Sequence, residues 1–208
     1  MDAVLARKLI PAVTIEDAEL AAPLGEALLA GGLDVVEVTF RTTVAEAAIR
    51  NIARRFPAMQ LGAGTLLTAE QVRRARDAGA TFGVSPGISE DVLQQAQAVG
   101  LAMIPGVSTP TEIMRALALG CRVLKFFPAD AVGGVPALKA IGGAFAHTGV
   151  RFVPTGGING QNLREYLALP FVAAVGGSWM VEKTLIASRN WRQIEALTRA
   201  AVALAAQA

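Results

Sequence analysis

The sequence predicts an α/β protein, a single-domain (β/α)8 TIM barrel that occupies residues 1–208. Eight strand-like segments alternate with amphipathic helical segments along the 208 residues, at nearly even spacing. This alternation is typical of a parallel sheet covered by helices, and eight such units make one closed barrel. A doubly wound open sheet is the rival architecture. The chain lacks both the G-x-G-x-x-G pattern after the first strand and a phosphate loop of the G-x-x-x-x-G-K type, which disfavours that rival.

The expected strands are short apolar runs, and several of them end at a proline. They cover residues 9–13, 35–40, 60–66, 81–85, 102–105, 122–127, 151–154 and 172–175. Pro86, Pro105, Pro128 and Pro154 lie at or just past the ends of four of them. Proline cannot donate a hydrogen bond to a central ladder, so it marks the place where pairing stops. These ends form the rim at which barrel enzymes keep their active sites.

The expected helices carry start and stop signals. A short segment, 1–8, precedes the first strand, and the first helix after that strand ends at Gly31-Gly32. Three later helices begin with a threonine followed three residues on by glutamate or glutamine, which predicts capping boxes at Thr43/Glu46, Thr68/Gln71 and Thr109/Glu112. Ser89 begins another helix. Glycines stop helices at 79, 100 and 120, and an alanine-rich helix covers about 191–206.

Composition excludes several kinds of function. With 53% hydrophobic and 17% charged residues the chain is globular, and a net charge of +2 without a basic run disfavours a nucleic-acid partner. Cys121 and His147 are the single residues of their kinds, so we expect no disulfide framework, no metal site and no cofactor. The start lacks a secretory signal, and the apolar stretch 171–181 is too short to span a membrane. We therefore expect a cytoplasmic protein without a membrane partner.

Lys125 is the most informative residue. It lies within the run Val123-Leu124-Lys125-Phe126-Phe127-Pro128, which otherwise predicts a buried strand. Burial disfavours the charged form of an amine, so this lysine is either paired or neutral part of the time. A neutral amine is nucleophilic and can form a Schiff base with a carbonyl substrate. A structural ion pair in the core is the alternative interpretation.

A second polar group is predicted on the strand at 35–40. Side chains alternate along a strand, so Glu37, Thr39 and Arg41 share one face, and helices cover the other, apolar face. If Lys125 also points inward, an amine, a carboxylate and a guanidinium meet inside the barrel. Glu37 is suited to move protons during Schiff-base chemistry, and Arg41 is suited to clamp a substrate carboxylate. The alternative is that Glu37 only neutralises Lys125 or Arg41.

Small residues follow the last two expected strands. Thr155-Gly156-Gly157 comes after the seventh strand and Gly176-Gly177-Ser178 after the eighth. Glycine-rich loops at these two positions form the usual phosphate site of a barrel, because backbone N–H groups can approach the anion closely. Thr65, at the end of the third strand, can donate a hydrogen bond to a substrate oxygen or can be a plain strand-end threonine. The residues therefore predict a lysine-dependent enzyme acting on a phosphorylated oxo-acid.

The chain resembles the bacterial 2-keto-3-deoxy-6-phosphogluconate (KDPG) aldolases, which include 4-hydroxy-2-oxoglutarate (KHG) aldolases and use a class I, Schiff-base mechanism. The matching segments follow one another in family order along nearly the whole chain: residues 37–42 (EVTFRT), 62–65 (GAGT), 85–87 (SPG), 104–106 (IPG), 125–129 (KFFPA), 154–157 (PTGG) and 176–179 (GGSW). The resemblance implies KDPG as substrate, no cofactor, a homotrimer and a place in the Entner–Doudoroff pathway.

The resemblance also implies a role for each matching residue. Lys125 is similar to the Schiff-base lysine and Glu37 to the proton-transfer residue. Arg41 and Thr65 resemble the site of the pyruvate carboxylate. The phosphate end corresponds to Gly156, Gly157, Gly177 and Ser178, and Thr155 resembles the residue that helps to set stereochemistry at the new carbon centre. Two alternatives stay open at this point: a barrel phosphosugar isomerase or synthase without a Schiff base, and a non-catalytic metabolite-binding barrel.

Overall fold

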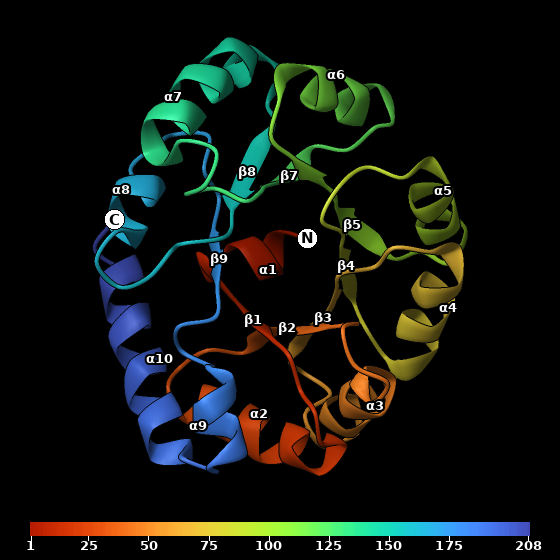
Figure 1. Cartoon of the computed structure of the whole chain (residues 1–208), viewed down its shortest axis with the longest axis vertical. Helices are drawn as coiled ribbons and strands as arrows, with labels where there is room; N and C mark the ends of the chain where they lie inside the picture. The colour runs from red at the N-terminus through yellow and green to blue at the C-terminus, as the bar shows by residue number, and fades with distance from the viewer.

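A computed structural model describes residues 1–208 and contains two parallel sheets inside a ring of helices (Figure 1). The larger sheet has six strands in the order β5-β4-β3-β2-β1-β9, and the smaller has three in the order β6-β7-β8. The strands are β1 Leu9–Val13, β2 Val35–Thr39, β3 Gln60–Gly64, β4 Phe82–Val84, β5 Ala102–Ile104, β6 Gly106–Val107, β7 Val123–Phe126, β8 Arg151–Pro154 and β9 Val175–Gly177. The predicted α/β class is confirmed.

Helices follow most of the strands and lie on the outside of the sheets (Figure 1). The α-helices are α1 Asp2–Leu5, α2 Ala21–Ala30, α3 Ala45–Arg55, α4 Ala69–Ala78, α5 Glu90–Ala98, α6 Pro110–Ala118, α7 Gly134–Phe145, α8 Leu163–Leu167, α9 Lys183–Ala187 and α10 Trp191–Ala205. Two short 3-10 helices, η1 Ala18–Leu20 and η2 Ala146–Thr148, complete the set. None of the helices is long and apolar enough to cross a membrane.

The two sheets meet at two junctions. At the first junction a single residue, Pro105, separates β5 from β6 within one extended segment. At the second, β8 and the residue after it pair with the segment 172–176 through two isolated parallel bridges, Phe152 with Val172 and Thr155 with Gly176, and not through a continuous ladder. The strands are therefore arranged as a six-stranded and a three-stranded sheet, and not as one uninterrupted eight-stranded ladder.

The last predicted strand is displaced along the chain. The apolar run predicted a strand at 172–175, whereas β9 covers Val175–Gly177 and pairs with β1 from Leu9↔Val175 to Pro11↔Gly177. Glycines are poor strand formers in isolation, but here a neighbour needs the space. A Cβ atom on Gly176 would lie 2.3 Å from the Thr155 hydroxyl oxygen. Because β9 includes Gly176 and Gly177, the Gly-Gly pair belongs to the strand and not to a loop after it.

The helix starts agree with most of the capping signals. Thr68, Ser89 and Thr109 each accept a hydrogen bond from the backbone of the first turn, and Thr109 with Glu112 forms a complete capping box. The capping box predicted at Thr43 is wrong, because α3 begins at Ala45 and has no side-chain cap. Glu46 forms ion pairs with Arg50 and Arg74 instead, both at 2.8 Å. Arg50, one turn further along α3, and Arg74, from α4, compete with the local backbone for its carboxylate.

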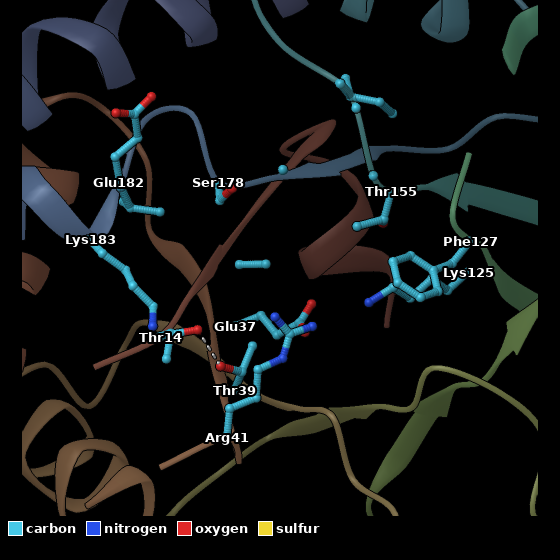
Figure 2. Close-up of a pocket in the computed structure, with 16 residues that line it drawn as sticks. Thr14, Glu37, Thr39, Arg41, Lys125, Phe127, Thr155, Ser178, Glu182 and Lys183 are labelled. Atoms are coloured by element: carbon cyan, nitrogen blue, oxygen red, sulfur yellow. Dashed lines mark hydrogen bonds between the residues drawn. The ribbon is translucent and has the colours of Figure 1, made fainter. Parts of the chain in front are cut away.

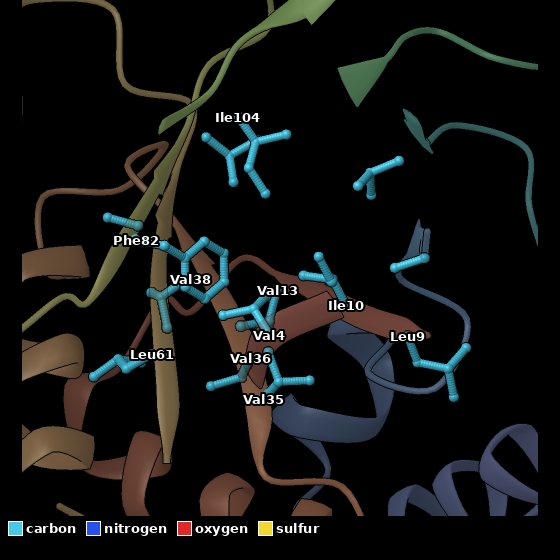
Figure 3. Packing of buried hydrophobic residues seen from close by; sticks show 14 of the residues in the cluster. Val4, Leu9, Ile10, Val13, Val35, Val36, Val38, Leu61, Phe82 and Ile104 are labelled. Atoms are coloured by element: carbon cyan, nitrogen blue, oxygen red, sulfur yellow. The ribbon is translucent and has the colours of Figure 1, made fainter. Parts of the chain in front are cut away.

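A single cluster of 55 buried apolar residues fills the space between the strands and the helices, part of which Figure 3 shows. On β2, Val36 and Val38 belong to this cluster, and Glu37 and Thr39 alternate with them as predicted. Helix α1 adds Val4 and Leu5 to the cluster. Its Asp2 accepts a hydrogen bond from Arg151, the first residue of β8, at 3.0 Å, so α1 lies at the amino-terminal end of the strands.

Candidate active site

A polar cavity of about 390 Å³ lies among residues at the carboxyl ends of the strands (Figure 2). Eight of the nine side chains or glycines that the sequence predicted for the site line it: Glu37, Arg41, Lys125, Thr155, Gly156, Gly157, Gly177 and Ser178. Thr65 is the exception, since it is not among the 16 lining residues. Strands from both sheets contribute, so segments far apart in the sequence converge on one cavity.

Lys125 projects into this cavity from β7, a strand whose four residues are all buried. The residue is only 5% exposed, and its Nζ atom forms neither an ion pair nor a hydrogen bond in the structure. Its nearest aromatic neighbour is Phe127, with Nζ 4.8 Å from the ring centroid. The alternative of a lysine neutralised by a structural ion pair is therefore wrong. An unpaired buried amine is the arrangement that favours nucleophilic chemistry.

Glu37 reaches the same cavity from β2 and is 3% exposed. Its Oε1 atom is buried without any hydrogen-bond partner, so Glu37 does not neutralise Arg41 or Lys125. Gly64 of β3 makes room for the carboxylate, because a Cβ atom at that position would lie 1.8 Å from Oε1. Buried polar groups in folded proteins are nearly always satisfied. Oε1 lies against Gly64 without a donor, and Glu37 as a residue lines the cavity, so its carboxylate has no structural partner and is available for chemistry there.

Arg41 and Thr65 lie next to each other, and the Arg41 Nε atom donates a hydrogen bond to the Thr65 hydroxyl at 3.2 Å. Thr65 has a φ of 57°, in the left-handed region that a β-branched residue rarely adopts. That backbone conformation directly follows β3 and turns the chain toward α4. The pair thus forms one corner of the site, although only Arg41 touches the cavity itself.

The glycine-rich segments line another part of the cavity. Gly156 and Gly157 have φ values of 101° and 79°, which a glycine adopts without strain. A Cβ atom on Gly157 would lie 2.3 Å from the Asp130 Cβ atom, so close packing also requires a glycine there. The Asn162 side chain donates a hydrogen bond to the Gly157 carbonyl at 3.0 Å and holds this loop in place. Ser178 is exposed beside it, and its hydroxyl has no partner in the structure.

Sequence reasoning placed Thr39 on the inward face without giving it a role, and it missed Thr14 and Lys183, which also line the cavity. Thr14 and Thr39 approach with their hydroxyl oxygens 3.0 Å apart, and the Thr39 hydroxyl also donates to the Val13 carbonyl at 3.0 Å. Thr14 follows the first strand, so the rule that the site lies at strand ends could have found it. Lys183, which also lines the cavity, follows no strand directly and carries no such signal. No group of three or more His, Cys, Asp or Glu side chains is arranged to hold a metal ion.

A parallel α/β fold with a buried unpaired lysine and a buried carboxylate in one polar cavity has the groups that a carbon–carbon lyase of the aldolase class needs for Schiff-base chemistry. The family model for KDPG and KHG aldolases matches residues 2–197. A 2-dehydro-3-deoxy-phosphogluconate aldolase of Treponema pallidum is 48% identical over 92% of this chain and 90% of its own.

Solved structures agree with the sequence comparison. A KDPG aldolase from Legionella pneumophila, with pyruvate captured as a covalent carbinolamine intermediate, has a TM-score of 0.91 at 46% identity and covers 96% of both chains. A KDPG aldolase of Zymomonas mobilis with 3-phosphoglycerate has a TM-score of 0.89 at 41% identity, over 98% of this chain and 95% of its own. The chain belongs to the KDPG and KHG aldolase family. That membership excludes the isomerase and the non-catalytic alternatives.

Proposed function

We propose that this protein is a class I aldolase that cleaves KDPG to pyruvate and glyceraldehyde 3-phosphate through a Schiff base on Lys125, and that also acts on 4-hydroxy-2-oxoglutarate. The observation that carries the proposal concerns Lys125, a residue that is 5% exposed, has an unpaired amine and lines the polar cavity. Lys183 is the other amine of the cavity, but it is exposed and paired with Glu16 at 3.0 Å. The carbinolamine in the Legionella relative requires an amine, and Lys125 is the better candidate.

The substrate would bind with its carboxylate at Arg41 and Thr65 and its phosphate at the other end. The Arg41 guanidinium suits a carboxylate because it can donate two parallel hydrogen bonds. For the phosphate we propose backbone N–H groups of Gly156, Gly157 and Gly177 together with the Ser178 hydroxyl. Thr155, whose hydroxyl oxygen approaches Gly176, would contact the hydroxyl-bearing carbon and help to set stereochemistry.

The proposed reaction begins when the neutral Lys125 amine attacks the C2 carbonyl and forms a carbinolamine. Glu37 moves a proton from nitrogen to oxygen and then relays one further proton from solvent to the hydroxyl group, so that water leaves and an iminium ion remains. The Glu37 carboxylate then removes the proton of the C4 hydroxyl. The C3–C4 bond breaks, its electrons pass into the iminium to form an enamine, and glyceraldehyde 3-phosphate departs. Glu37 returns the proton to C3, and water hydrolyses the iminium to release pyruvate, the free lysine and the proton that was taken up from solvent. This cycle needs no metal or organic cofactor.

We further propose that the two sheets together form a single-domain (β/α)8 barrel. The unbroken course from β5 through Pro105 to β6 supports closure on one side, and the Phe152–Val172 and Thr155–Gly176 bridges support it on the other. The family resemblance adds a homotrimer, a cytoplasmic location and a place in the Entner–Doudoroff pathway to the proposal.

The test of the function is borohydride reduction of the protein in the presence of pyruvate, followed by intact-mass measurement and peptide mapping. We expect a stable adduct on Lys125 and its loss in Lys125→Met. Lys183→Ala is the matched control, since it removes the other amine of the cavity and should keep the adduct. A folded protein that gains no mass, or that carries the adduct on Lys183, would contradict the proposed mechanism.

A further inference from the structure

The cavity contains three basic side chains: Arg41, Lys125 and Lys183. The proposed function uses Arg41 for the carboxylate and Lys125 for the carbonyl carbon. The phosphate end is then left with neutral donors, namely the backbone of the glycine-rich segments and the Ser178 hydroxyl. KDPG carries its largest negative charge at that end, because a phosphate monoester has nearly two negative charges at neutral pH. Lys183 is the one cation of the cavity without a role.

Lys183 lines the same cavity as the phosphate end, from the segment that follows Ser178. It is the first residue of α9, five positions after Ser178. Figure 2 shows its side chain extending toward Thr14, on the side of the cavity opposite to Lys125. A lysine side chain is long and flexible, and its ammonium group can donate three hydrogen bonds in different directions. Rotations about its carbon chain can therefore move the ammonium group away from Glu16 and into the cavity.

The partner of Lys183 lies outside the cavity. The Nζ atom contacts Glu16 Oε1 at 3.0 Å, and both side chains are well exposed, at 61% and 72%. Glu16 is not a lining residue of the cavity but lines an adjoining hollow of about 420 Å³ that also includes Lys183 and Thr14. An exposed ion pair between two long side chains stabilises a protein little. A phosphate with nearly twice the charge of a carboxylate can compete for this ammonium group.

We infer that Lys183 is a further specificity-determining residue, whose ammonium group leaves Glu16 and binds the distal phosphate of the substrate. This inference rests on the proposed aldolase function. Glu16 then has a second effect, because it holds Lys183 in the absence of substrate and so competes with phosphate. The two residues should have opposite effects on the affinity for phosphorylated substrates and little effect on the chemical step.

The test compares steady-state kinetics with KDPG and with 2-keto-3-deoxygluconate, which differs only in lacking the phosphate. We expect Lys183→Ala to raise KM for KDPG about tenfold with a much smaller change in kcat, since the lost contact is an ionic hydrogen bond distant from the reacting carbon. The kcat/KM for 2-keto-3-deoxygluconate should change by less than about twofold. Lys183→Arg keeps the charge and should restore most of the affinity for KDPG.

The Glu16→Gln variant is expected to lower KM for KDPG about two- to threefold, because it frees the ammonium group at little cost. Lys139→Ala and Glu19→Gln are the matched controls, since both residues are exposed, neither side chain has an ion-pair partner and neither lines the cavity. Each control changes the net charge by the same amount as the variant that it matches, and it should leave the kinetics with both substrates unaffected. An equal loss for the two substrates in Lys183→Ala, or no loss for either, would overturn the inference.

Calorimetric titration with glycerol 3-phosphate separates this inference from the proposed function, because it needs no turnover. If the Lys183→Ala variant binds this phosphate ester more weakly than the wild type does, and the wild type cleaves neither oxo-acid, the aldolase proposal fails and the phosphate contact stands. If the wild type cleaves KDPG and the variant binds the ester and KDPG as well as the wild type does, the contact is wrong and the aldolase function stands.

Discussion

Glu37 is a buried carboxylate with one oxygen that no donor satisfies, and it faces the same cavity as Lys125. A Glu37→Gln variant keeps the size of the side chain but cannot accept and release a proton. We expect kcat for KDPG to fall about a hundredfold to ten-thousandfold, the usual contribution of general acid–base catalysis. The melting temperature should stay close to that of the wild type. A kcat within about threefold of wild type would show that another group moves the protons.

Gly64 has a role that its backbone conformation does not explain, since its φ is not in the left-handed region. The missing side chain is what matters, because a Cβ atom would lie 1.8 Å from Glu37 Oε1. We expect Gly64→Ala to displace the carboxylate, to lower kcat about a hundredfold and to reduce the free energy of unfolding by about 2 kcal/mol through overpacking. Kinetics and urea unfolding measure the two effects.

A double-mutant cycle separates this contact from a general intolerance of alanine in β3. In the Glu37→Ala background the carboxylate is gone and the added methyl group has space. The destabilisation by Gly64→Ala should therefore shrink to less than about 0.5 kcal/mol in that background. The same loss in both backgrounds would mean that the strand, and not Glu37, rejects the methyl group.

Among the secondary-structure elements, α6 has the most complete start. The Glu112 carboxylate accepts hydrogen bonds from the backbone N–H groups of Ser108, at 2.8 Å, and Thr109, at 2.9 Å. The Ser108 backbone contact is the largest cause that holds the Glu112 pKa below its usual value of 4.5, with the Thr109 side chain and backbone contributing further and burial opposing them. A pKa that is lower in the folded state than in the unfolded chain stabilises the fold above the unfolded value, and this stabilisation is lost as pH falls.

The Glu112→Gln variant tests this pH dependence. It should be less stable than wild type at pH 7, where the wild-type carboxylate is ionised in the folded and unfolded states. The difference should shrink as pH falls from about 4.5 through the lower pKa of the folded state, because the carboxylate is protonated first in the unfolded chain and then in the folded protein. Urea midpoints at pH 7 and pH 3 measure it. A difference of the same size at both values would mean that the charge of Glu112 contributes nothing.

Helix α10 packs on α2 with a buried hydroxyl that has no partner. Thr198 on α10 is completely buried and its Oγ1 atom makes no hydrogen bond. It lies against Gly31 at the end of α2, where an added Cβ atom would be 2.6 Å from the Thr198 Cβ atom. Thr198→Val replaces the hydroxyl by a methyl group of the same shape. We expect the free energy of unfolding to rise by about 1 kcal/mol, measured by urea denaturation, since an unsatisfied buried polar group is removed. Thr198→Ser keeps the hydroxyl and should not stabilise.

For the whole molecule, the main expectation beyond the single chain is assembly. The family resemblance implies a homotrimer, and large apolar side chains such as Leu67 and Met114 are 56% and 63% exposed in one chain. Apolar surface of this kind is often covered in an oligomer, although isolated exposed residues are common. We expect light scattering to give about three times the single-chain mass of 21.6 kDa. A mass of one chain at micromolar concentration would contradict the trimer.

The sequence by itself determined the parts of the site that depend on neighbours along the chain. The two-residue period of β2 placed Glu37 and Arg41 on one face, and an apolar run around Lys125 predicted its burial, because strand geometry alternates side chains wherever the strand pairs. The helix starts at Thr68, Ser89 and Thr109 also depend on near neighbours, because a capping side chain accepts a hydrogen bond from a backbone N–H group two or three residues away. The sequence therefore predicted them.

Only the tertiary structure decided the contacts between distant segments. The register of β9 depends on its pairing with β1 and on the space that Thr155 takes at Gly176, and neither is visible in the local pattern. Glu46 left its expected cap because Arg74 comes within 2.8 Å from another helix. Lys183 meets Glu16 across 167 positions of sequence. Such contacts depend on how the sheets and their helices pack in three dimensions, and local preferences along the chain cannot specify that arrangement.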